Sequence, residues 1–74
     1  MKITVRTPLC GNDICSLLDG KTYGEVSFRF LRRQGISWEY EADGTDGEAA
    51  ATLAKSLIKA ADFGKVLNFS VICG

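Results

Sequence analysis

Histidine is absent from this sequence, proline occurs once, and the formal net charge is zero. Histidine is the commonest general base in enzymes and a frequent metal ligand, so its absence removes the usual starting point for both kinds of site. Nine basic and nine acidic side chains cancel, whereas proteins that bind nucleic acid or anionic membranes directly generally carry a basic excess. We therefore expect neither direct nucleic-acid binding nor membrane binding.

Long hydrophobic runs are also missing. No stretch approaches the roughly 18 apolar residues of a membrane span, and the polar start MKITVRT has no signal-peptide apolar region. With 74 residues, 46% hydrophobic and 24% charged, the chain has an ordinary globular composition and is near the lower size limit for one core. We expect a single cytoplasmic domain, residues 1–74.

Cysteines are few and odd in number, namely Cys10, Cys15 and Cys73. An odd count without a secretory signal does not favour a disulfide framework. The Cys10 and Cys15 pair suggests a metal site, but a closed zinc site usually takes four Cys or His ligands. The favoured interpretation is reduced, partly buried thiols. Metal binding through Cys10 and Cys15 is the alternative, and we expect no cofactor.

The residues that are present indicate short strands and helices. Residues 2–7 alternate apolar and polar side chains as a half-buried strand does. Residues 10–20 predict a short helix of one or two turns, with Asn12 or Asp13 as the N-terminal cap and Gly20 as the stop.

A central hairpin is predicted from two alternating runs joined by residues 33–35, with Gly35 in the left-handed position. The aromatic residues of both runs then share one face, and charged residues share the other. The register of this turn predicts the cross-strand pairs Phe28–Tyr40, Arg29–Glu39 and Phe30–Trp38.

A long helix follows, because Thr45 and Glu48 have the spacing of a capping box and Gly64 stands where a C-terminal cap is expected. Its apolar stripe consists of Ala50, Leu53, Ala54, Leu57 and Ala61. Residues 65–73 predict a last strand, whose core-facing residues are Leu67, Phe69, Val71 and Cys73.

This order predicts an α+β fold, ferredoxin-like or a related β-(short α)-β-β-α-β arrangement. The antiparallel sheet would have four strands, with the long helix packed on one face. The other face would carry Lys2, Thr4, Arg6, Arg29, Glu39, Glu41, Asn68 and Ser70.

The carboxylates Glu39, Glu41 and Asp43 are candidates for an acid–base pair. However, Glu39 and Glu41 fall on the solvent face of a strand, so a hydrated charged surface is the favoured interpretation. We expect no catalytic residues and no enzyme activity.

Charge is predicted to separate along the molecule, with arginines near the hairpin tip, close to Lys59 and Lys65, and acids toward the other end. Helix-dipole matching and ordinary surface charge explain this pattern without a partner. Alternatively it serves recognition of a protein partner: the acids would meet a basic groove of a nucleic-acid-binding complex, or the arginines would meet phosphates or carboxylates.

A homodimer through an exposed strand edge is also expected. The candidate partner-binding residues are Arg29, Arg32, Arg33, Glu39, Glu41, Asp43, Asp46 and Glu48.

Residues 24–64, GEVSFRFLRRQGISWEYEADGTDGEAAATLAKSLIKAADFG, resemble small phage-encoded anti-CRISPR proteins, which show a hairpin followed by a glycine-marked, alanine-rich helix. The resemblance implies a non-catalytic inhibitor, from a phage or mobile element, that binds a CRISPR effector complex and blocks target DNA or nuclease recruitment. It assigns no specific residue.

A second resemblance concerns Cys10 and Cys15, which follow the first predicted strand. Heavy-metal-associated domains are ferredoxin-like and carry two cysteines at a comparable place, but with two intervening residues where this chain has four. This resemblance implies the alternative function, a cytoplasmic thiol- or metal-binding module.

Overall fold

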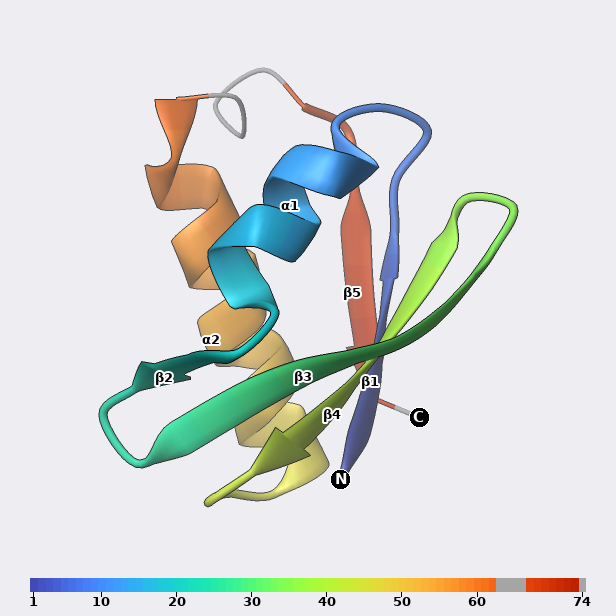
Figure 1. The fold of residues 1–74 in the computed structure, drawn as a ribbon. Coiled ribbons are helices and arrows are strands. Elements are labelled where there is room, and N and C mark those ends of the chain that lie inside the picture. Colours follow the sequence, from blue (N-terminus) through green and yellow to red (C-terminus); the bar gives the residue numbers. More distant parts are fainter. Residues whose placement is uncertain (63–66, 74) are drawn as a thin grey trace.

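The computed structural model describes residues 1–62 and 67–73. Over these residues the chain is a small α+β structure with a five-stranded antiparallel sheet and two helices. Figure 1 shows both helices on the same side of the twisted sheet. The elements in chain order are β1 (Lys2–Arg6), α1 (Gly11–Leu18), β2 (Lys21–Tyr23), β3 (Val26–Gln34), β4 (Ser37–Asp43), α2 (Gly47–Ala60) and β5 (Ser70–Cys73).

The described strands lie in the order β2-β3-β4-β1-β5, and each neighbouring pair is antiparallel. The predicted α+β class and antiparallel sheet are confirmed, but the predicted count of four strands was wrong. Lys21–Tyr23 adds the edge strand β2 beside β3. A strand of three residues is too short for a periodic pattern to appear in the sequence. Its position depends instead on a contact with α1, where the Tyr23 hydroxyl donates to the carbonyl oxygen of Leu17 at 2.6 Å.

The core lies between the sheet and the helices. Ala50 and Ala54, both members of the predicted apolar stripe, are on the buried side of α2 and let the helix approach the sheet. Ile58 is fully buried although the predicted stripe omitted it, whereas Leu53 and Leu57 are only partly buried. The buried side of α2 therefore consists of Gly47, Ala50, Ala54 and Ile58. The largest fully buried side chains are Tyr40, Phe28, Ile3, Ile14, Leu18, Ile58 and Val5.

The predicted hairpin register was wrong by two residues. The turn consists of Gly35 and Ile36 alone, because Gln34 pairs with Ser37, and Gly35 takes φ +59°. A β-bulge at Leu31 then inserts one extra residue into β3. With this turn but no bulge, core-facing residues of one strand would lie opposite outward-facing residues of the other, and the bulge restores the alignment of the faces. The observed pairs include Phe28–Ala42, Arg29–Glu41, Phe30–Tyr40 and Arg32–Glu39.

The helix ends also differ from prediction. The N-cap of α1 is Cys10, at φ 61° and with no side-chain cap bond, rather than Asn12 or Asp13. The N-cap of α2 is Asp46, whose Oδ1 accepts from the backbone N–H of Ala49 at 2.7 Å.

The predicted capping box at Thr45 and Glu48 was therefore wrong by one position. Asp46 is an equally favourable cap residue, and its placement decides where the helix starts. The predicted cap at Gly64 and the cation Lys65 lie outside the described residues. The last strand, predicted over residues 65–73, spans only Ser70–Cys73 in the described part of the chain.

Candidate functional site

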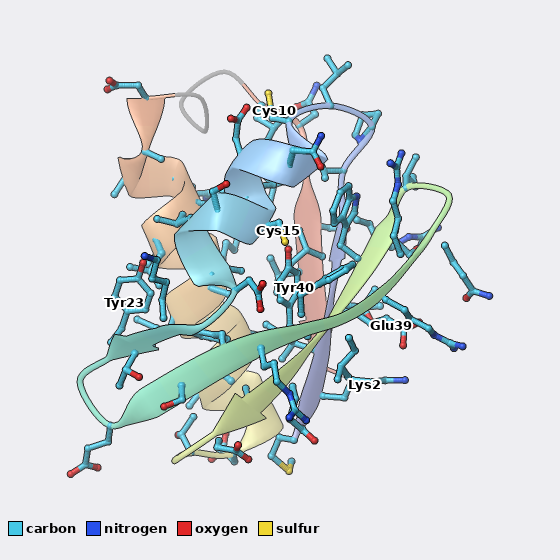
Figure 2. All side chains as sticks on the ribbon, viewed as in Figure 1. Lys2, Cys10, Cys15, Tyr23, Glu39 and Tyr40 are labelled. Carbon is cyan, nitrogen blue, oxygen red and sulfur yellow. The ribbon has the colours of Figure 1, made fainter. Side chains whose placement is uncertain are left out.

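The side of the sheet opposite the helices is charged, and no described helix covers it. Figure 2 shows the side chains of Lys2 and Glu39 on this side, whereas Tyr40 points toward α1. We call this side the open face. The strand register places on it Lys2, Thr4, Arg6, Ser27, Arg29, Arg32, Gln34, Ser37, Glu39, Glu41, Asp43, Ser70 and Ile72.

Glu39 lies at the centre of the open face, and its side chain is only 11% exposed. Its Oε1 lies 3.2 Å from Nε of Arg32 and 3.3 Å from Nζ of Lys2. The hydrogen bond from Arg32 is the main cause that lowers the pKa of Glu39, and Lys2 adds to it. This carboxylate is therefore ionised and engaged within the chain, which suits neither proton transfer nor a contact with a cationic partner.

Glu41 is engaged in a similar way, by a group that the sequence reasoning missed. The amino group of Met1 lies 2.8 Å from its Oε2 and also donates to the carbonyl oxygen of Ala42 at 2.9 Å. The hydrogen bond between them raises the pKa of the Met1 amino group and lowers the pKa of Glu41. The signal in the sequence was that β1 begins immediately after Met1.

The cations of the open face stay accessible. Lys2 is 45% and Arg32 is 61% exposed, and Arg6 and Arg29 are exposed. Among the described residues, Arg6 and Arg29 have no carboxylate within ion-pair distance. Glu39 is covered by its neighbours, Glu41 is paired with the Met1 amino group, and Asp43 at the end of β4 is exposed. With four accessible cations against this exposed acid, the accessible charge of the face is predominantly positive.

The predicted separation of arginines from acids does not hold on the open face. Arg29 lies opposite Glu41 and Arg32 opposite Glu39, so these charges alternate across neighbouring strands. Asp43, Asp46 and Glu48 are exposed around the start of α2, where Asp46 serves as the helix cap. Arg33 lies on the other side of the hairpin from Arg32, with its guanidinium carbon 4.8 Å from the centroid of the Trp38 ring.

The hairpin tip adds apolar surface next to these arginines. Leu31 and Ile36 are 42% and 46% exposed. The backbone N–H of Thr7 donates to the carbonyl oxygen of Ile36 at 2.9 Å, which places the loop after β1 beside the turn. In that loop Leu9 is 68% exposed. The sequence did not predict this apolar tip, because the predicted turn of residues 33–35 ended before Ile36, which then began the following strand.

A shallow hollow of about 370 Å³ lies where β2, β3 and β4 meet. Its lining carries both signs of charge, from Lys21, Arg29, Glu41 and Asp43. The hydroxyls of Thr22 and Ser27, 3.1 Å apart, add polar groups. A hollow of this composition suits a polar side chain of a partner more than an apolar ligand.

The cysteines do not converge. Figure 2 shows Cys10 at the outer end of α1 and Cys15 between α1 and the sheet, near Tyr40. All three cysteines are free thiols. Across residues 1–62 and 67–73 no group of three or more Cys, Asp or Glu side chains is placed to hold a metal ion. The geometry therefore gives no support to a shared site for Cys10 and Cys15.

Comparison of the chain with models of known protein families, with curated proteins and with solved structures found no match. Neither of the helices in the described part of the chain has the length and apolar character needed to cross a membrane.

Proposed function

We propose that this chain is a non-catalytic protein-interaction module that binds its partner through the open face and the hairpin tip. The observation that carries the proposal is the state of the charges on that face. Glu39 and Glu41 are held by groups of the chain itself, while Arg6 and Arg29 stay exposed. A chain with zero net charge thus presents a cationic face.

The partner that fits such a face is a protein with an acidic surface. Arginine binds carboxylates in a two-pronged geometry, and complementary charge favours both fast association and selectivity. The apolar side chains of Leu9, Leu31 and Ile36 would supply contact area beside the charges.

We also propose that the fold is a variant of the ferredoxin-like arrangement. Without the edge strand β2, the order is β3-β4-β1-β5, in which two crossover connections interlock. In this view β2 is an additional edge strand outside the ferredoxin-like core. We propose separately that the chain acts in the cytoplasm. The open face is then the broad surface that the fold leaves for binding.

The resemblance of residues 24–64 to anti-CRISPR proteins suggests a specific partner, a CRISPR effector complex. The channel that holds nucleic acid in such complexes is positively charged and would repel a cationic face. Of the two implied modes of inhibition, interference with nuclease recruitment therefore fits the charge of this surface better than occupation of the target DNA channel.

The test is a phage-plating assay on bacterial strains that carry different CRISPR systems, with and without this chain. We expect plating of a targeted phage to rise toward that of a non-targeted phage in at least one strain. The variant Arg6→Glu with Arg29→Glu should lose the effect. The control Lys55→Glu with Lys59→Glu changes charge equally on the exposed side of α2 and should keep it. No rescue in any strain would contradict the assignment of the partner.

A further inference from the structure

The two edges of the sheet differ in how they resist pairing with another strand. Natural proteins protect sheet edges with short strands, bulges and charged residues. On one edge, β2 has three residues, and the part of β3 beyond it carries the bulge at Leu31 and the exposed residues Arg32 and Arg33. In addition, Oδ1 of Asp19 accepts from the backbone N–H of Phe30 at 2.9 Å. This edge is well protected.

The opposite edge, β5, is also short, with four residues, but it carries neither a bulge nor a charged residue in its described part. Ser70–Cys73 contains no charged residue, proline or glycine, and its register with β1 runs without a bulge. Ile72 is 48% exposed. An uncharged, regular edge strand with exposed apolar side chains is the kind of strand that pairs with another chain.

The register also shows which backbone groups of β5 are available. Met1 and Ala42 exchange two hydrogen bonds, and Thr7 donates to Ile36. The odd-numbered residues of β1 therefore bond to β4, and the even-numbered ones bond to β5, because hydrogen-bonded pairs alternate along antiparallel strands. Since Ile72 lies opposite Thr4, its backbone groups face β1, while those of Val71 and Cys73 point to the free edge.

We propose that this chain forms a symmetric homodimer in which β5 pairs antiparallel with β5 of a second copy. The two-fold axis would pass between the two Ile72 residues, so that Val71 of each copy bonds to Cys73 of the other. In this register every outward backbone group of Val71 and Cys73 gains a partner. The two Ile72 side chains form a non-hydrogen-bonded pair, the pair type with the closest side chains.

The charges favour β5 of a second copy as the strand that pairs with the β5 edge. The β5 strand carries no charge and can therefore lie against itself without like-charge repulsion. The chain as a whole has zero net charge, which keeps the net repulsion between two copies small even though their cationic open faces become neighbours. The resulting dimer would join two open faces into one continuous surface, a consequence that does not depend on the identity of the partner.

The test is oxidative cross-linking of the 74-residue chain in a Cys73→Ser background. Ile72→Cys should form a covalent dimer, because the two introduced thiols face each other across the axis. The control Ile36→Cys has similar exposure, 46% against 48%, but lies at the hairpin tip and should form no covalent dimer. Equal cross-linking of both variants, or none in Ile72→Cys, would overturn the proposal.

An independent measurement is light scattering under reducing conditions. The unmodified chain should show twice the monomer mass of 8.0 kDa, and Ile72→Lys should return it to the monomer while Ile36→Lys does not. A monomer for the unmodified chain at all concentrations would also overturn the proposal and would leave the β5 edge to a strand of a different protein. Both results are independent of the phage-plating assay.

Discussion

At the scale of single residues, Tyr40 is the most unusual member of the core. Its ring is fully buried, and its hydroxyl makes no hydrogen bond of normal geometry among the described residues, although the weakly polar thiol of Cys15 lies close to it (Figure 2). A buried hydroxyl without a partner costs about 1–3 kcal/mol of stability. Burial raises the pKa of Tyr40 above its usual range, and the nearby Cys15 side chain contributes in the same direction.

Replacement of Tyr40 by Phe should therefore leave stability at pH 7 unchanged or raise it. The folded state holds the phenolic proton more tightly than the unfolded state, so its contribution is complete below pH 10 and is lost as the pH rises further. Above about pH 10, the unmodified chain should lose about 1.4 kcal/mol per pH unit relative to Tyr40→Phe. Urea unfolding of both chains between pH 7 and pH 11 measures this difference. A large loss for Tyr40→Phe at pH 7 would show that the hydroxyl has a partner.

The contribution of Glu39 to the stability of the fold depends on pH in the opposite direction from that of Tyr40. Its folded-state pKa is lowered by Arg32 and Lys2, so its contribution is present above the unfolded value of about 4.3 and is lost as the pH falls through the folded pKa. Glu39→Gln should be less stable than the unmodified chain at pH 7, and the difference should shrink below about pH 4. Thermal unfolding of both chains from pH 7 to pH 3 tests this. A difference that is constant over this range would contradict the role of the two cations.

At the scale of elements, the start of α2 packs directly on the end of β5. A Cβ atom added to Gly47 would lie 2.5 Å from Sγ of Cys73 and 3.3 Å from Cε of Met1. Here the small residue is needed for close approach, since Gly47 does not have positive φ. The contact links the helix that completes the core to the edge strand proposed for dimer formation.

Gly47→Ala should therefore destabilise the fold by about 1–3 kcal/mol, the usual cost of overpacking, although alanine normally favours a helix. Adding Cys73→Ala removes the sulfur and should recover most of this loss. The double-mutant cycle, measured by urea unfolding, isolates the contact. If the two changes were simply additive, the helix and the strand would not touch as described.

The sequence was sufficient for elements with a long periodic pattern, such as the hairpin strands and α2. It was not sufficient for features that depend on one residue in three dimensions. The bulge at Leu31 compensates for a two-residue turn, and β2 depends on the contact between Tyr23 and Leu17. Neither leaves a periodic signal. On the open face, Arg29, Glu39 and Glu41 were placed correctly, but their pairing depended on the register and on the N-terminal amine.

At the scale of the whole molecule, zero net charge conceals an uneven distribution. The open face presents Lys2, Arg6, Arg29 and Arg32 around two engaged acids, with the exposed Asp43 at the end of β4. Asp46 and Glu48 are exposed near the start of α2. The molecule therefore offers a cationic sheet face and an acidic helix end. Complementary potentials steer two proteins into contact. We therefore expect a partner to bind with its acidic surface against the cationic sheet face and away from the acidic helix end.

The affinity of the purified chain for the CRISPR effector complex of the strain that the plating assay identifies tests the central claim most directly. It should be compared between the variant Arg6→Glu with Arg29→Glu and the variant Lys55→Glu with Lys59→Glu, after circular dichroism has shown that both are folded. We predict that reversal of the open-face arginines abolishes binding, while reversal of the helix lysines leaves the affinity close to that of the unmodified chain. Retention of full affinity by the open-face variant would contradict the assignment of this face as the binding surface.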